Sequence, residues 1–452
     1  MSFGGLRIGS SGLTTAQRAL ETAAHNVANA NTIGYSRQRI ETSTARALTA
    51  HRGVLGPGST GQGVSMDAIG RATDTLLQTN HRQSLGQLAS WGTRANFFAR
   101  AEQVLGPLDS GLSQDLVAFW NSWEDLSQRP ESSTSRDQVL AAGSQLAGQL
   151  NQASRRIEGL RGEVSLDMNA TIDRVNDLTA EIARLNGQVK SARASGSTPN
   201  DLLDRRDVAL AELTELTGAV TTTEDDGDVR VTLNNLPLVQ GVGAEALDVT
   251  GTPPVVIWAA DGSTAGMAGE LGSLVELGGP VVDDLAARLD EIATELRDLV
   301  NATHAVGYGL DGVDGRDFFV GTDAGDLAVD SALTTDMVAA SATGATADGN
   351  QALALGGLRS VAGSGGATVG ELFEGLQGFL GLEAQQSAGQ RDLAELVVED
   401  VERSLAEVIG VSTDEELTDM LQYQRAYEAS ARVITVIDEM LDRLINGTGA
   451  TR

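Results

Sequence analysis

A few residues have types and spacings that could support chemistry, and each group has a simpler interpretation. A Gly-x-Gly-x-x-Gly pattern at residues 56–61 matches the turn that binds dinucleotides, but no convincing strand precedes it and no helix begins at Gly61. Asp311, Asp314 and Asp317 resemble a calcium loop, but they lack its alternate spacing of acids and its glutamate at position twelve. We interpret the glycines as a flexible loop and the aspartates as turn residues.

Other catalytic and metal-binding patterns are absent from the sequence. It has no cysteine, which excludes disulfides, cysteine-ligated zinc, iron–sulfur clusters and a thiol nucleophile. The four histidines form no His-Glu-x-x-His pair, and no Gly-x-Ser-x-Gly elbow occurs. The single lysine, Lys190, follows a valine, so a P-loop is excluded as well. We predict a protein that is not an enzyme and that has no catalytic residue, cofactor or metal site.

The balance of charge excludes two classes of partner. The 452 residues include 32 basic and 62 acidic side chains, a net charge of 32 − 62 = −30. Nucleic acids and anionic membranes both bind clustered positive charge, so we predict neither as a partner. No apolar run approaches the ~20 residues that span a bilayer, and residues 1–12 lack the apolar core of a secretory signal. We expect a cytosolic chain, or one exported by a route that needs no cleaved signal.

Both ends of the chain are predicted to be heptad helices, because apolar residues recur there at alternating spacings of three and four. The N-terminal helix should end before Gly34, and the C-terminal helix should begin at a capping box formed by Ser412 and Glu415. The N-terminal seam is Leu13, Ala16, Leu20, Ala23, Val27 and Ala30. The C-terminal seam is Met420, Tyr423, Tyr427, Ser430, Ile434, Ile437, Leu441 and Leu444.

The two terminal segments also carry opposite charge. Residues 1–52 hold six arginines and two glutamates, a net charge of 6 − 2 = +4, whereas residues 412–452 hold four arginines and eight acids, a net charge of 4 − 8 = −4. Coincidence would explain this difference. The sharper interpretation is that the two helices pair side by side, since a single heptad helix is only marginally stable in water.

Between the ends, the periodicity predicts a bundle of helices with a small β insertion. One helix from about residue 139 to Gly196 would contain roughly 55 residues and be about 80 Å long. The other predicted helices cover residues 74–105, 113–127, 200–217, 281–300, 350–361 and 369–409. Alternating residues after Asp226-Gly227 predict short strands, residues 318–320 predict a hairpin, and residues 41–70 read as an extended or loop-like connector.

These elements predict a mainly α fold with three domains. Residues 1–50 and 410–452 would form a terminal coiled-coil domain, and residues 51–218 and 266–409 a helical bundle. Residues 219–265 would form a small β domain inserted in that bundle. A polar cluster at residues 26–32, with three asparagines, marks the end of the first helix; it is either a built helix exit with side-chain-to-backbone bonds or a frayed end.

Four motifs, in order along the chain, resemble those of the bacterial flagellar axial proteins, the family of rod, hook and hook-associated subunits. Residues 26–38 are similar to its N-terminal signature, although Ile33 stands where proline is common, and residues 423–441 are similar to its C-terminal signature. Residues 200–207 (Asn-Asp-Leu-Leu-Asp-Arg-Arg-Asp) resemble a middle motif that rod and hook proteins lack, and residues 301–319 are a weaker match. The Tyr-Ser-Arg-Gln ending of the first signature is most similar to the hook-associated protein 1 group.

The resemblance implies a structural subunit of the flagellum that forms the junction between hook and filament. Its terminal helices would pair in the inner tube and assemble the subunits into a ring between the hook protein and the next hook-associated protein. It also implies type III export from the cytoplasm to the extracellular flagellum, and an export chaperone that binds the C-terminal helix. A hook, rod or flagellin-like subunit is the alternative, and an enzyme embedded in the polymer is a more remote one.

We predict that the contacts with other subunits and with the chaperone come from the two terminal helices. Residues Met420, Tyr427, Ile434 and Leu441 would serve both purposes. The full set of predicted contact residues is Leu13, Leu20, Val27, Asn29, Tyr35, Met420, Tyr423, Tyr427, Ile434, Ile437 and Leu441.

Overall fold

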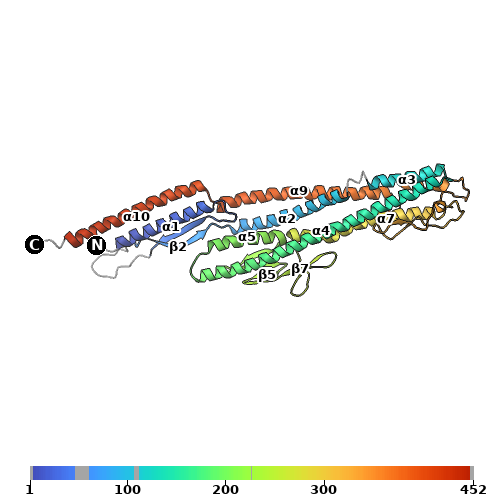
Figure 1. Cartoon of the computed structure of the whole chain (residues 1–452). Coiled ribbons are helices and arrows are strands. Elements are labelled where there is room, and N and C mark those ends of the chain that lie inside the picture. Colours follow the sequence, from blue (N-terminus) through green and yellow to red (C-terminus); the bar gives the residue numbers. More distant parts are fainter. Residues whose placement is uncertain (1–3, 46–60, 106–110, 225–226, 448–452) are drawn as a thin grey trace.

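The protein is an elongated rod of helices with its N- and C-terminal ends at the same end of the rod (Figure 1). The computed structural model describes residues 4–45, 61–105, 111–224 and 227–447. The glycines at positions 56 and 58 lie outside these ranges, so the loop interpretation of their motif stays a prediction. Within the described ranges, no helix combines the length and the apolar character needed to cross a membrane.

The bundle is built around α4 (Ser133–Ala194), a helix of 62 residues. At about 1.5 Å per residue, this helix is about 93 Å long. Its buried aliphatic side chains recur at spacings of three and four, as predicted, and they face the other bundle helices. The helix begins six residues earlier than position 139 because the Ser132 side chain accepts a hydrogen bond from the Ser135 N–H and caps it.

The remaining bundle helices lie alongside α4 or alongside one another (Figure 1). α2 packs along α9, while α3, α5 and α7 pack on α4. All of them except α6 agree with predicted helical segments, because no helix was predicted over residues 269–276. A short π-helix, Leu277–Val281, joins α6 to α7. The helices are α2 (Thr75–Leu105), α3 (Leu112–Gln128), α5 (Asn200–Thr217), α6 (Gly269–Glu276), α7 (Val282–His304), α8 (Asn350–Gly357) and α9 (Val369–Ile409).

Aromatic side chains gather at the end of the bundle opposite the chain termini. The ring centroids of Trp123 and Phe318 lie 5.3 Å apart, and those of Phe119 and Phe319 lie 5.6 Å apart. The predicted hairpin is present, since β9 (Phe319–Val320) pairs antiparallel with β10 (Ala328–Val329). These rings give the distal end a dense aromatic core.

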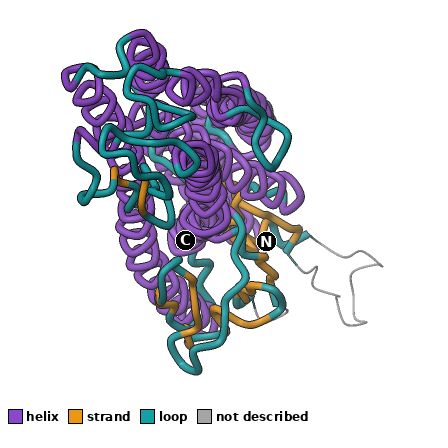
Figure 2. Tube along the Cα trace, turned by 90° about the vertical axis from the view of Figure 1, so that its right-hand side faces the viewer, coloured by secondary structure: helices purple, strands orange, loops and turns teal. Residues whose placement is uncertain are grey.

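The β elements between α5 and α6 form two small antiparallel sheets, seen in orange in Figure 2. A four-stranded sheet has the order β3-β4-β5-β6, and β7 pairs with β8. Asn234 and Asn235, both at positive φ, form the tight turn between β4 and β5. The strands are β3 (Val220–Thr223), β4 (Val229–Leu233), β5 (Leu236–Gln240), β6 (Gly243–Ala244), β7 (Leu247–Thr250) and β8 (Val255–Trp258).

The terminal helices and one hairpin form an arm that projects from the bundle. The arm consists of α1 (Gly4–Asn29), α10 (Thr413–Gly447), β1 (Gln38–Thr44) and β2 (Val64–Arg71). The connector predicted over residues 41–70 is therefore strand at both of its ends. The alternation that would have signalled these strands is interrupted by a register shift between Glu41 and Thr42.

The predicted fold class is confirmed, since long helices dominate and the sheets are small and antiparallel. The division into a terminal domain (1–50 and 410–452), a bundle (51–218 and 266–409) and a β domain (219–265) remains a proposal. Because β2 pairs with β1, we would extend the first segment of the terminal domain to Arg71.

Candidate functional site

α1 and α10 pack antiparallel in the arm, and they approach each other so closely that three positions of α1 have no room for a side chain. A Cβ atom closer than 3.0 Å to another side chain would force that side chain or one of the two helices to shift. Alanines at positions 16, 19 and 23 continue this face and are buried. The distances for an added Cβ are 2.9 Å from Gly5 to Ile437 Cδ1, 2.8 Å from Gly9 to Ile434 Cγ1 and 2.9 Å from Gly12 to Ser430 Oγ.

The predicted seam residues lie along this contact, with a difference between the two helices. On α10, the seam faces α1: Met420, Tyr423, Ile434, Ile437 and Leu441 are half-buried, and Tyr427 is 39% exposed. The side chain of Leu444 lies outside the described residues. On α1, the closest contact is made by glycine and alanine, so the larger Leu13, Leu20 and Val27 lie at its edge and are half-buried.

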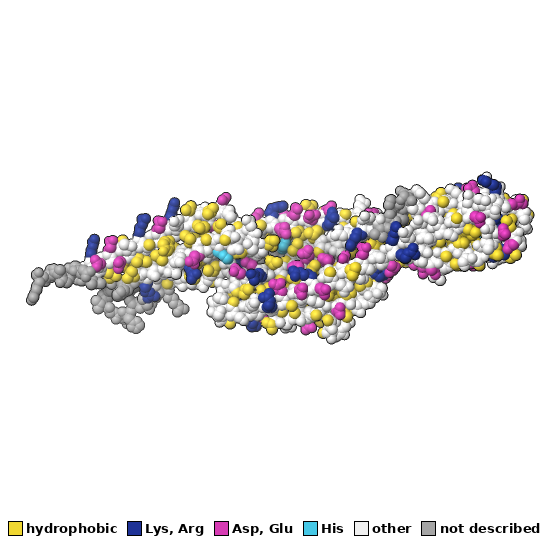
Figure 3. Space-filling model, viewed as in Figure 1, with side chains coloured by type: hydrophobic (Ala, Val, Ile, Leu, Met, Phe, Trp, Pro, Cys, Tyr) yellow, Lys and Arg dark blue, Asp and Glu magenta, His cyan; other side chains and the backbone are white. Residues whose placement is uncertain are grey.

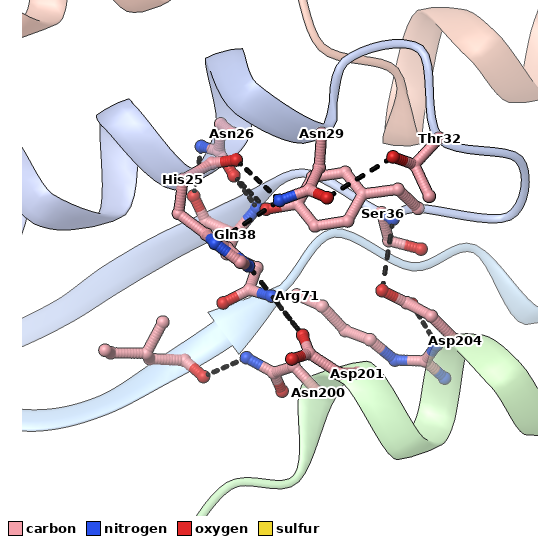
Figure 4. Close-up of polar contacts among 12 residues, drawn as sticks. His25, Asn26, Asn29, Thr32, Ser36, Gln38, Arg71, Asn200, Asp201 and Asp204 are labelled. Carbon is pink, nitrogen blue, oxygen red and sulfur yellow. Dashed lines mark hydrogen bonds and ion pairs between the residues drawn. The ribbon is translucent and has the colours of Figure 1, made fainter.

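The polar cluster at the end of α1 is a built helix exit, and its centre is Asn26 (Figure 4). The Asn26 side chain is 1% exposed and makes four hydrogen bonds. Its Nδ2 donates to the Gln38 carbonyl at 2.9 Å and to Glu416 Oε2 at 3.0 Å. Its Oδ1 accepts from the Gln38 N–H at 3.0 Å and from the Tyr35 hydroxyl at 2.7 Å. Asn26 therefore joins α1, β1 and α10 with all of its amide groups satisfied.

Asn29 and Tyr35, both predicted contact residues, hold the loop between α1 and β1 (Figure 4). Asn29 Nδ2 donates to the His25 carbonyl at 3.0 Å, and its Oδ1 accepts from the Thr32 hydroxyl at 3.3 Å. Burial, followed by the charge of Asp204, raises the pKa of the Tyr35 phenol above its ordinary value. The phenol therefore remains protonated and able to donate to Asn26 over the physiological range.

Arg37 connects the two ends of the chain through ion pairs with three carboxylates of α10. Its Nε lies 2.5 Å from Glu416 Oε1, its Nη1 2.9 Å from Glu415 Oε2 and its Nη2 3.5 Å from Asp419 Oδ2. Burial alone would lower the pKa of Arg37, but the charges and hydrogen bonds of Glu416 and Glu415 together outweigh burial and raise it. The opposite charges noted in the two terminal segments thus meet at this joint, where the arm leaves the bundle.

The arm is attached to the bundle through α5. Asp204 accepts from the Ser36 N–H at 3.3 Å and from Arg71 Nη1 at 2.9 Å, and Arg71 also lies 2.6 Å from Asp207 Oδ2. Asn200 Nδ2 donates to the carbonyl of residue 69 in β2 at 2.8 Å (Figure 4). Burial raises the pKa of Asp204, while Arg71 and Ser36 act against this rise.

Two hollows, of about 400 and 370 Å³, flank the loop between α1 and β1. Ile33, Tyr35 and Val208 line both of them, and Ile33 is 91% exposed. Gly34 holds the loop against α5, since a Cβ atom there would lie 2.2 Å from Val208 Cγ2. Across the described ranges, no group of three or more histidine and acidic side chains is placed to hold a metal ion.

Several residues of this joint were missed by sequence reasoning: Arg37, Arg71, Asp204 and Glu416. Arg37 and Asp204 were inside motifs whose resemblance had been noted, but the motifs carry no information on which residues meet. Glu416 belongs to an acidic first turn of α10, a pattern that also occurs simply because acids stabilise helix N-termini.

Three family models match separate parts of the chain. The model of the flagellar hook-associated protein FlgK helical domain matches residues 98–319. The model of the flagella basal body rod protein matches residues 6–35, and that of the flagellar basal body rod FlgEFG protein C-terminal region matches residues 404–447. The match at residues 6–35 contains most of α1, and the match at residues 404–447 contains all of α10.

Similar proteins from four bacteria are all named flagellar hook-associated protein 1. The chain is 29% identical to flagellar hook-associated protein 1 of Bacillus subtilis, with 99% of both chains covered. It is 29% identical to flagellar hook-associated protein 1 of Salmonella typhimurium over 68% of this chain, but it spans only 58% of that longer relative. The chain is also similar to a solved structure, the flagellar hook junction protein FlgK from Burkholderia pseudomallei. The two align over 54% of this chain and 46% of that protein, with a TM-score of 0.49 and 25% identity.

Proposed function

Because the chain belongs to the flagellar hook-associated protein 1 family, we propose that it forms the junction between hook and filament and assembles there through its terminal arm. The family is structural, so the chain is a subunit of the bacterial flagellum and not an enzyme. It works with other flagellar axial components.

The observation that supports the assembly role best is the coincidence of the arm with the two rod-type matches. Residues 6–35 and 404–447 match models of other axial subunits, and these are the segments that pack together as α1 and α10. The central match at 98–319 is specific to the hook-associated helical domain. We infer that the arm supplies the contacts common to axial subunits, while the bundle supplies those of the junction.

The surface of the arm supports this division. Hydrophobic atoms gather along it in Figure 3, whereas charged and polar atoms alternate over much of the bundle. On α10, Leu417, Leu421, Val433, Val436 and Met440 are each between 46% and 58% exposed. Together with the half-buried Leu13 and Leu20 of α1, they provide apolar area that neighbouring subunits would cover. We propose that these surfaces close the subunits into a ring in the inner tube.

We also propose that an export chaperone binds the C-terminal helix, and the structure requires that it do so before α1 packs on α10. The seam residues Met420, Ile434 and Leu441 face α1, so a chaperone that binds them must displace α1. We therefore expect the chaperone to hold the chain before the arm has formed, in the cytoplasm. After type III export, pairing of α1 with α10 and contact with the hook protein and the next hook-associated protein would replace it.

Electron microscopy of a strain that lacks the gene tests the proposal. A junction subunit predicts hooks of normal length that carry no filament, with filament protein released into the medium. The alternative is a hook, rod or flagellin-like subunit. A hook or rod subunit predicts that the hook itself is missing, and a flagellin-like subunit predicts bare hooks without released filament protein. The motif at residues 200–207 favours the junction, because rod and hook proteins lack it. An enzyme embedded in the polymer would leave filaments attached.

A further inference from the structure

We propose that the groove between α2 and the edge strand β3 binds an extended segment of another protein, which adds to β3 as a further strand and places an acidic side chain on Arg82. The partner is defined by its chemistry, an extended backbone that carries a carboxylate. This surface lies on the bundle and the β domain. The inference therefore goes beyond the proposed function, which names no binding site outside the arm.

The groove is a hollow of about 540 Å³, larger than either of the two hollows beside the loop between α1 and β1. It is lined by α2, the end of α5, β3 and the start of α6. These elements meet closely below it. A Cβ atom added at Gly86 would lie 3.3 Å from the Thr214 carbonyl oxygen, and one added at Gly269 would lie 2.4 Å from the Glu215 carbonyl oxygen. The packing of its own walls therefore forms the groove before any partner binds.

One wall of the groove is an open strand edge. Among the described residues, β3 pairs with β4 alone, so it forms one edge of the four-stranded sheet. Within Val220–Thr223 there is no proline, no charged residue and no bulge, although these are the features that usually protect an edge. The other edge strand, β6, is protected by its length of two residues. β3 is therefore the edge of this sheet that is suited to accept another strand.

The opposite wall is one side of α2. Gln83 and Gln87 are exposed there, and each carries both a donor and an acceptor for the polar groups of a bound segment. The lining residues of α2 run from Thr79 to Trp91, a rise of about 18 Å along the helix. At about 3.4 Å per residue, this length matches about five residues of extended chain.

Arg82 is the charged group of α2 in this groove, and it is half-buried. Its Nη2 donates to Thr79 Oγ1 at 3.5 Å, and among the described residues it forms no ion pair. The other two arginines of α2 differ, because Arg94 and Arg100 each pair with two carboxylates. Arg82 is therefore the arginine of this helix that is left to bind the carboxylate of a partner.

Charge complementarity selects an acidic partner over a neutral one. Burial lowers the pKa of Arg82, and the charge of Asp207 acts against this shift. Asp207 itself lies 2.6 Å from Arg71, so its charge is shared with another guanidinium. A carboxylate that enters the groove would form charge-assisted hydrogen bonds with Arg82, and guanidinium groups bind carboxylates through two such bonds at once.

Selection from a library of random peptides of seven residues, displayed on phage, tests the partner chemistry. The immobilised full chain should enrich peptides that share an acidic residue, and Arg82→Gln should not enrich them. The matched control is Arg100→Gln, which removes an arginine of the same helix that does not line the groove and should enrich the same peptides as the parent. Failure of the parent to enrich any peptide over Arg82→Gln would overturn the proposal.

An enriched peptide, synthesised, tests the mode of binding. Its affinity should fall about tenfold when its acid is replaced by the matching amide, and about tenfold on Arg82→Gln. Alternate amides of a strand point in opposite directions, so N-methylation of one alternate set should abolish binding and methylation of the other set should be tolerated. Amide exchange should slow over β3 and remain parental over β6.

Equal loss of affinity with both methylated sets, or unchanged exchange over β3 in the complex, would contradict strand addition. The N-methylated peptides are measured on the parent chain, so this part of the test holds even if Arg82→Gln loses its helical circular dichroism.

Discussion

Arg37 Nε and Glu416 Oε1 lie 2.5 Å apart, and this pair connects the residue just before β1 to the first turn of the last helix. The two side chains are 10% and 3% exposed, so the pair is largely removed from water. Residues almost 380 positions apart in the sequence therefore fix the point at which both terminal helices leave the bundle.

Replacing Arg37 by methionine should loosen the arm without unfolding the bundle. The substitution leaves the Glu416 carboxylate buried without its cation, which costs about 3 kcal/mol or more. We expect amide hydrogen exchange to accelerate over α10 and to remain parental over α4. Arg39→Met, which removes an exposed arginine two residues away, is the control. Equal protection of α10 in the Arg37 variant and in the parent would contradict this role.

The glycine face of α1 makes a second prediction. Gly9→Ala places a Cβ atom 2.8 Å from Ile434 Cγ1, so α1 and α10 must separate or repack, at a cost of about 1–3 kcal/mol. Exchange over α10 should become at least about fivefold faster. Gly92→Ala in α2 is the matched control, because no atom lies within 4 Å of its added Cβ. There the better helix propensity of alanine should stabilise the helix by about 0.5–1 kcal/mol. Similar behaviour of the two variants would show that α1 and α10 do not pack this closely.

Elements with a long, regular spacing of apolar residues could be predicted from the sequence, and elements whose spacing is interrupted could not. The 62 residues of α4 repeat one spacing many times, and the predicted helix needed correction only at its start. β1 and β2 are longer than the strands that were predicted, and they were missed because a register shift interrupts their alternation. The heptad of α1 was correctly seen, but spacing alone favours its leucines as the contact, whereas the close approach selects the glycines beside them.

The joint could be predicted less well than the helices. Asn26 stood out as one of three asparagines in six residues, but its partners lie in β1 and in α10, on distant segments of the chain. Nothing in the spacing of residues 200–207 tells which carboxylate meets Arg71 and which side chain faces the β domain. Such contacts depend on how separate segments are brought together, and a single sequence carries no record of that.

His304 predicts how the stability of the distal end depends on pH. Its Nδ1 lies 2.7 Å from the Arg316 carbonyl, and its Nε2 accepts from the Ala339 N–H at 3.0 Å, so the ring is neutral. Burial lowers the pKa of His304 to about 4, from 6.5. Below pH 6.5 the unfolded chain therefore binds a proton that the folded chain does not, and stability is lost as pH falls.

Between pH 7 and pH 5, this one residue should remove about 2 kcal/mol from the free energy of unfolding of the bundle. His304→Gln keeps a donor and an acceptor but does not titrate in this range. The measurement is urea unfolding of the parent and the variant, followed by the fluorescence of the tryptophans, which include Trp123 next to His304. Parallel pH profiles of the two proteins would refute the assignment.

The most direct test of the central claim, assembly through the arm at the hook–filament junction, is the fraction of hooks that carry a filament. A strain that lacks the gene is complemented with the parent chain or with a variant carrying Tyr427→Glu and Ile434→Glu, two changes on the seam of α10. The purified variant should keep the thermal unfolding of its bundle, and electron microscopy should show bare hooks, in contrast to the filaments restored by the parent. Filaments at the parental frequency on hooks of the variant strain would contradict the account.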